Sequence, residues 1–91
     1  FVPGNHDWDN TGERGLEHLQ NQEWLLGRTL GFGTLRPKAG CPGPEVLVNT
    51  NNFFVLSIDS MWFLHPHKKL TGAQCEAGSV AEFEQRLATL L

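Results

Sequence analysis

Apolar residues recur at the spacing of an amphipathic helix near the start of the chain. Leucines at positions 16, 19, 26 and 30 are separated by mostly polar residues, which predicts a helix over about 13–26. Asn10 and Glu13 have the spacing of a capping box at the start of this helix. Gly27 and Gly31 are candidate stop signals at its end.

A second helix is predicted at the end of the chain. Ser79 and Glu82 have the spacing of another capping box. The apolar residues that follow share one helical face: Val80, Phe83, Leu87, Leu90 and Leu91. The chain therefore stops inside a predicted helix.

Between the two helices, the pattern predicts a β-hairpin. Its strands are Glu45–Asn49 and Phe53–Ile58, joined by a turn at Thr50–Asn52. The second strand is apolar at nearly every position, so we expect it to be covered on both faces, as in a layered α/β protein. The preceding segment, Arg36–Pro44, holds three prolines and two glycines and predicts a stiff loop.

The first residues resemble the end of another buried strand. Phe1 and Val2 are apolar and stop at the breakers Pro3 and Gly4. Because apolar runs meet both ends of the sequence, we expect residues 1–91 to be the central segment of a larger domain, with further parts on either side. The compartment is left open for the same reason.

Composition narrows the class of protein only slightly. Ninety-one residues allow one small domain at most, and a net charge of −3 gives no basic surface for nucleic acid. No apolar run is long enough to cross a membrane. Cys41 and Cys75 lack zinc-finger spacing. A disulfide between them is possible in an exported protein, but two separate small thiols are the favoured interpretation.

The residues that could carry chemistry follow the first predicted strand. Gly4 permits a sharp turn, and Asn5 offers a carboxamide oxygen suited to a divalent cation. His6 can exchange a proton near neutral pH, and Asp7 beside it can fix one tautomer. An ordinary polar turn is the alternative, because Asn and Asp are common after Pro-Gly.

The run Val2–Asp7 resembles the Gly-Asn-His-Asp block of the calcineurin-like metallophosphoesterases. A Gly-Cys-Pro-Gly-Pro loop and an apolar strand ending in Asp-Ser-Met-Trp make the chain similar to a bacterial branch of that superfamily. The resemblance implies a layered sandwich of mixed sheet flanked by helices. It also implies hydrolysis of a phosphate-ester substrate at a dinuclear centre of manganese, iron or zinc.

The resemblance assigns roles to four residues. It implies that Asn5 ligates one metal ion, that His6 protonates or assists the leaving oxygen, and that Asp7 orients His6. It also implies that Gly4 lets the backbone approach the metals. The other ligand motifs of the family are not in this chain, so we expect a partial metallophosphoesterase domain that is inactive alone. The alternative is a catalytically dead relative that binds a partner or acts as a scaffold.

Three further residues are candidates for a substrate pocket: Trp8, Asp59 and Trp62. For Asp59 the favoured alternative is a carboxylate bonded to nearby backbone amides. For the two tryptophans it is packing in the core. The pair His65 and His67 predicts a solvated loop near the surface. A small metal-binding domain built on His6, His65 and His67 is a rival hypothesis.

Overall fold

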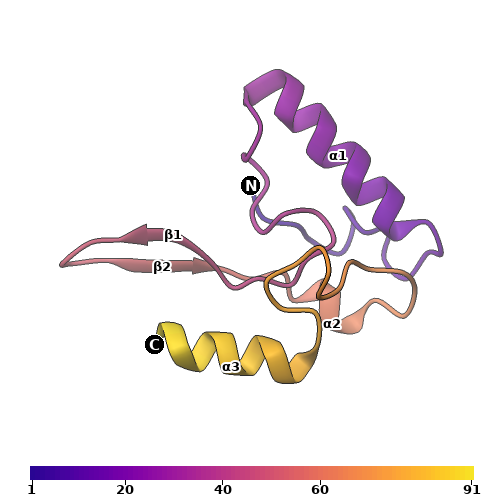
Figure 1. Ribbon diagram of the computed structural model, residues 1–91. Helices are drawn as coiled ribbons and strands as arrows, with labels where there is room; N and C mark the ends of the chain where they lie inside the picture. The colour runs from indigo at the N-terminus through magenta and orange to yellow at the C-terminus, as the bar shows by residue number, and fades with distance from the viewer.

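The computed structural model describes residues 1–91 and holds three helices and one two-stranded sheet. In chain order the elements are α1 (Gly15–Leu30), β1 (Glu45–Asn49), β2 (Phe54–Ser57), α2 (Met61–Leu64) and α3 (Val80–Leu90). Figure 1 shows the hairpin extending away from the rest of the chain, with α1 and α3 on opposite sides of it. The content of helix and antiparallel strand confirms a mixed α/β class. None of the helices has the length and apolar content needed to span a bilayer.

The first predicted helix forms, but its boundaries and cap differ from the prediction. α1 runs to Leu30, so Gly27 lies inside the helix and is not the stop signal that was predicted. The absent Cβ of Gly27 makes room for the Phe32 ring. Gly31, with φ of 105°, ends the helix. The capping box predicted from Asn10 is wrong: the N-cap residue is Arg14, which makes no side-chain cap bond.

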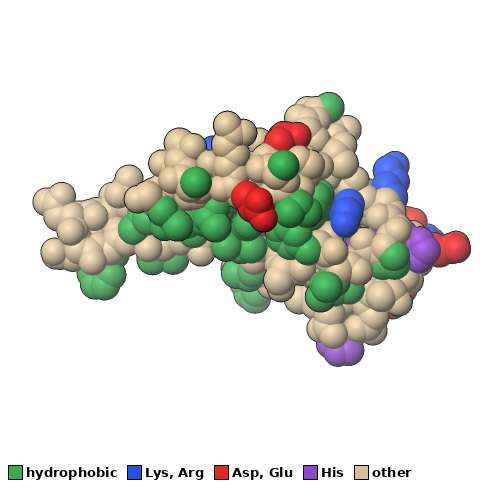
Figure 2. All heavy atoms as spheres, turned by 90° about the horizontal axis from the view of Figure 1, so that it is seen from below, with side chains coloured by type: hydrophobic (Ala, Val, Ile, Leu, Met, Phe, Trp, Pro, Cys, Tyr) green, Lys and Arg blue, Asp and Glu red, His purple; other side chains and the backbone are tan.

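The predicted hairpin is confirmed. β1 and β2 pair antiparallel, with an irregularity between Val46 and Val48. The expectation that the second strand is covered on both faces is wrong, since successive side chains of β2, which point to opposite faces, remain exposed. Its residues Phe54 and Val55 are 40% and 42% exposed, and Phe53 in the turn is 67% exposed. Figure 2, seen from below, shows a band of apolar side chains along this part of the molecule.

The last part of the chain forms one helix that was predicted and one that was not. α3 begins at the predicted cap, where the backbone N–H of Glu82 donates to Ser79 Oγ at 3.2 Å. α2 is a single turn that the apolar run at 61–64 did not reveal. Lys69 Nζ closes its end by donating to the carbonyl oxygens of Trp62 and His65, at 2.6 and 3.2 Å.

A disulfide joins Cys41 to Cys75, so the favoured interpretation of two separate thiols is wrong. The loop at 36–44 folds against the segment that follows α2. The backbone N–H of Leu70 donates to Gly40 O at 2.9 Å, which brings the two cysteines together across 34 positions. The spacing of the cysteines carries no information about that contact.

The core lies where α1, α2 and the start of the chain meet. It consists of Trp8, Leu16, Leu19, Leu35, Ala39, Met61 and Trp62. The predicted first strand is wrong: Phe1 and Val2 form no strand and are exposed. Phe1 instead lies along residues 34–36, since its carbonyl accepts from Arg36 N at 2.8 Å.

Candidate functional site

Residues 4–10, here the motif turn, fold into a series of tight turns. The backbone N–H of Asp7 donates to Gly4 O at 3.2 Å, and that of Asn10 donates to Asn5 O at 2.7 Å. Asp9 and Asn10 have positive φ, at 54° and 52°. Asn and Asp tolerate this conformation better than other residues that carry a Cβ, so the polar sequence explains why the chain turns here.

Some side chains of the motif turn are exposed to solvent and others are buried in the core. Asn5 and His6 are exposed, whereas Trp8 is fully buried. Asn5 Nδ2 donates to Asn10 Oδ1 at 3.2 Å, and this bond leaves the side-chain oxygen of Asn5, Oδ1, for another partner. The two residues with predicted chemistry are therefore displayed next to a side chain that ties the turn to the core.

Asp7 closes the motif turn instead of binding its predicted partner, His6, by a hydrogen bond. Its Oδ2 accepts from the backbone N–H of Gly4 at 2.8 Å, and it forms no hydrogen bond with His6. A carboxylate three residues beyond a free N–H makes this local bond readily. At Gly4 a Cβ would lie 3.6 Å from Asp7 Oδ2, an ordinary contact, so packing within this chain does not require glycine there.

Asp59 anchors the motif turn through its bond with Trp8. Trp8 Nε1 donates to Asp59 Oδ2 at 2.8 Å, and the backbone N–H of Met61 donates to Oδ1 at 3.0 Å. The carboxyl is fully buried. This burial raises its pKa, and the bonds from Trp8 and the backbone oppose the rise. The interpretation of Asp59 as a carboxylate bonded to backbone amides is confirmed, with the Trp8 indole as a second donor.

The two candidate pocket tryptophans are core residues in this structure, as the favoured alternative predicted. Trp8 has no exposed surface and Trp62 has almost none. Trp62 Nε1 donates to Leu70 O at 3.1 Å, and Lys69 Nζ lies 4.3 Å from the centre of its ring. Burial lowers the pKa of Lys69. A substrate would reach neither indole without a rearrangement of the core.

His65 is buried, so the prediction of a surface position for it is wrong. It is 2% exposed, and its ring centre lies 4.8 Å from that of Trp8. His65 Nδ1 lies 3.1 Å from the carbonyl oxygen of Asn10, and Nε2 has no partner. The space exists because Gly15 has no Cβ, which would lie 2.5 Å from His65 Cε1. His67 is exposed.

Residues 1–91 form no complete metal centre, and Asn5 is the one metal ligand that the resemblance implies. Nowhere in residues 1–91 do three His, Cys, Asp or Glu side chains gather closely enough to hold a metal ion. His6, His65 and His67 are accordingly not brought into one group. The exposed carboxamide of Asn5 fits an oxygen ligand for a hard or borderline cation.

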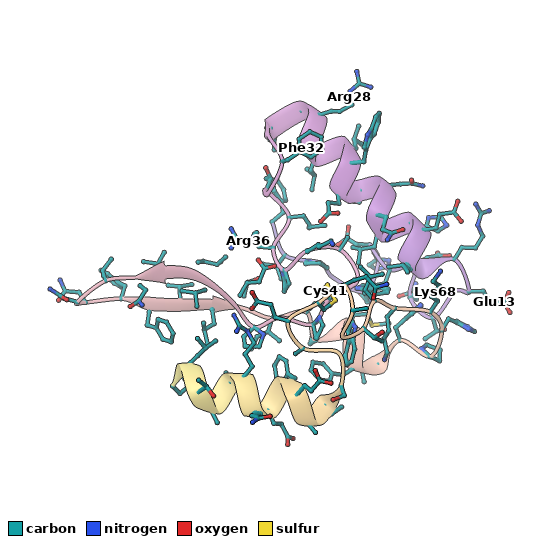
Figure 3. The ribbon with its side chains drawn as sticks, viewed as in Figure 1. Glu13, Arg28, Phe32, Arg36, Cys41 and Lys68 are labelled. Atoms are coloured by element: carbon teal, nitrogen blue, oxygen red, sulfur yellow. A yellow bond between two sulfur atoms is a disulfide. The ribbon has the colours of Figure 1, made fainter.

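The largest cleft of the molecule lies elsewhere. It has a volume of about 970 Å³ and runs between α1, the loop at 36–44 and α3, with no lining residue from the motif turn. Four of its six charged side chains form ion pairs, Arg36 with Glu45 and Arg86 with Glu76. Figure 3 labels Phe32, Arg36 and Cys41 on this side of the molecule. The cleft and the motif turn are therefore separate features.

No protein-family model, curated protein or solved structure matches the chain. The resemblance to metallophosphoesterases therefore stays a prediction from the sequence, which none of these comparisons tests. The structure gives Asn10 and His65 a contact that the sequence pattern did not predict. The Asn-Asp-rich turn gave a signal for Asn10, whereas nothing in the spacing signals that His65 contacts it across 55 positions.

Proposed function

We propose that the chain is the central part of a calcineurin-like metallophosphoesterase, which hydrolyses phosphate esters at a dinuclear metal centre. In this proposal Asn5 ligates one of two manganese, iron or zinc ions and His6 assists the leaving oxygen. The hairpin and the helices belong to a larger layered sandwich. The remaining ligands come from parts of the protein outside residues 1–91.

The observation that supports the proposal most is the exposure of Asn5 and His6 on a turn that a buried side chain, Trp8, fixes to the core. Both are exposed while Trp8, two residues after His6, is fully buried and bonded to Asp59. An ordinary polar turn does not need such an anchor. A site does, because ligands and proton donors act only when they are held in position.

The chemistry divides between the metal ions and the residues of this chain. When bound, the metal centre supplies charge stabilisation for the phosphoryl oxygens. Asn5 contributes a neutral oxygen donor, and the exposed His6 imidazole can hold a proton and give it to the leaving oxygen. Asp7 contributes by closing the turn through Gly4.

The test uses the full-length protein that contains this chain, purified with Mn²⁺ and assayed on p-nitrophenyl phosphate and bis(p-nitrophenyl) phosphate. His6→Ala should lower kcat by about 10²–10⁴-fold with a small change in KM, since proton transfer matters chiefly in the transition state. The matched control is His67→Ala, which removes an exposed histidine outside the motif turn. It should leave both constants unchanged.

Asn5→Ala should lower the bound Mn²⁺ and the activity together. Unchanged turnover in His6→Ala would contradict the assignment of His6. A folded wild-type protein that turns over neither ester and binds no Mn²⁺ would favour the alternative, a catalytically dead relative that binds a partner.

A further inference from the structure

A chain of contacts leads from the core to the Asn5 side chain. Its first link is His65, which is buried beside Trp8 and lies 3.1 Å, through Nδ1, from the carbonyl oxygen of Asn10. Its second link is the pair of bonds between Asn10 and Asn5. The backbone N–H of Asn10 donates to Asn5 O at 2.7 Å, and Asn5 Nδ2 donates to Asn10 Oδ1 at 3.2 Å.

The first link places a hydrogen on His65 Nδ1. A carbonyl oxygen only accepts, so Nδ1 must carry the hydrogen and donate it to Asn10. The other nitrogen, Nε2, is buried without a partner. The bond to Asn10 is therefore the one hydrogen bond that the buried imidazole ring makes. A buried polar side chain with a single bond is costly to place in a core, which favours a role for that bond.

The second link fixes the Asn5 amide. A carboxamide has a donating and an accepting end, and only the oxygen can ligate a cation. With Nδ2 committed to Asn10, the two ends of the Asn5 amide are no longer interchangeable. Asn10 can act in this way because its positive φ, 52°, turns the chain back toward Asn5.

Resting on the proposed function, we propose that His65 and Asn10 are positioning residues for the metal ligand Asn5. His65 holds the Asn10 backbone, and the Asn10 side chain holds the Asn5 amide so that its oxygen is presented for coordination. Neither residue touches metal or substrate. Groups that orient a ligand in this way commonly change metal affinity by 10–100-fold when they are removed.

Four variants separate the two links. His65→Phe keeps an aromatic ring beside Trp8 and removes the donor, whereas His65→Asn keeps a donor at the Nδ1 position and removes the ring. Asn10→Gly keeps the positive φ and the carbonyl but removes the acceptor for Asn5 Nδ2. Asn10→Asp keeps that acceptor. The control is His67→Phe, an exposed histidine converted in the same way.

The measurement is Mn²⁺ affinity of the full-length protein, from the electron paramagnetic resonance signal of free Mn²⁺ during a titration, with circular dichroism to check the fold. We expect His65→Phe and Asn10→Gly to weaken binding by at least about 10-fold. His65→Asn should recover part of the loss. Asn10→Asp and His67→Phe should bind about as tightly as the wild type.

Wild-type affinity in both His65→Phe and Asn10→Gly would overturn this inference while leaving the proposed function intact. A wild-type protein that binds no Mn²⁺ would overturn the proposed function, and the inference with it. If His65→Phe fails to fold, the two variants of the exposed Asn10 provide the test. Equal Mn²⁺ affinity in Asn10→Gly and Asn10→Asp would overturn the inference. Weaker Mn²⁺ binding by Asn10→Gly alone would support it.

Discussion

The motif turn is rich in polar residues with candidate chemistry, and the hairpin is rich in apolar residues. The rest of the chain packs against the first far more than against the second. The motif turn is tied to the core by Trp8, which is fully buried and bonded to Asp59. The hairpin has only its own two strands, and Phe54 and Val55 remain largely exposed. A two-stranded hairpin of this kind is marginal by itself.

This difference shows which part of the molecule is held in place by contacts within residues 1–91. The motif turn, the segment at 59–65 and α1 form one buried cluster around Trp8. The apolar strand β2 instead presents side chains that residues 1–91 do not cover. The turn with the candidate chemistry should therefore be the rigid region, and the hairpin the locally unstable one.

The largest expected effect comes from truncating the anchor of the motif turn. Trp8→Ala should lower the free energy of unfolding by about 3–5 kcal/mol, since it removes a buried indole and leaves Asp59 Oδ2 without its donor. Phe54→Ala in the hairpin should cost less than about 1.5 kcal/mol, because much of that ring is already in solvent. Urea denaturation of both variants checks the comparison. Equal losses would contradict it.

Breaking the disulfide should cause the next largest loss in the free energy of unfolding. Cys41 and Cys75 close a loop across 34 positions, for which chain entropy predicts a stabilisation of about 3–4 kcal/mol. Thermal unfolding with and without reductant measures the loss. The matched control is the double variant Cys41→Ala/Cys75→Ala, which should not respond to reductant. A wild-type melting temperature insensitive to reductant would contradict the account.

The buried carboxyl of Asp59 should give the anchor a pH dependence of its own. Burial raises its folded-state pKa, so the folded protein binds this proton more tightly than the unfolded chain does. Its contribution to the free energy of unfolding is therefore fully present below about pH 4, the usual value for Asp, and is lost as pH rises through the raised pKa.

Asp59→Asn, which does not titrate, isolates that contribution. The free energy of unfolding of the wild type minus that of Asp59→Asn should fall as pH rises from about 4. Urea denaturation at a series of pH values provides the difference, in which the other titrating groups largely cancel. A difference that grows with pH would show that the hydrogen bonds outweigh burial.

The smallest expected effect lies at the cap of α3, beyond both regions. Ser79→Ala should cost about 1 kcal/mol, because Ser79 Oγ accepts from the backbone N–H of Glu82. Ser60 is the matched control, since it stands at the N-cap of α2 without a side-chain cap bond. Ser60→Ala should therefore be nearly neutral. Equal losses in the two variants would show that the Ser79 cap bond contributes little.

The sequence predicted the features that depend on neighbouring residues. The Ser79 cap, the hairpin and the turn after Gly4 follow from local propensities and local hydrogen bonds, and the structure contains all three. The cap at Asn10 was mispredicted because its side chain bonds to Asn5 instead of capping α1.

The contacts that support the candidate site could not be predicted from spacing. Asp59 meets Trp8 across 51 positions, and His65 meets Asn10 across 55. Both contacts join segments that lie far apart in the chain, and the room for His65 depends on the missing Cβ of Gly15. The disulfide was missed for the same reason, because the pairing of Cys41 with Cys75 is a property of the folded loops.

Hydrogen exchange of the Trp8 indole N–H, followed by nuclear magnetic resonance, tests the central claim most directly. If Trp8 and Asp59 hold the motif turn in place, this proton should exchange only on unfolding of the buried cluster. Its protection factor should then exceed those of the β2 backbone amides by at least about 100-fold. A Trp8 indole that exchanges as readily as the hairpin would contradict the account, because the turn would then have no anchor within the chain.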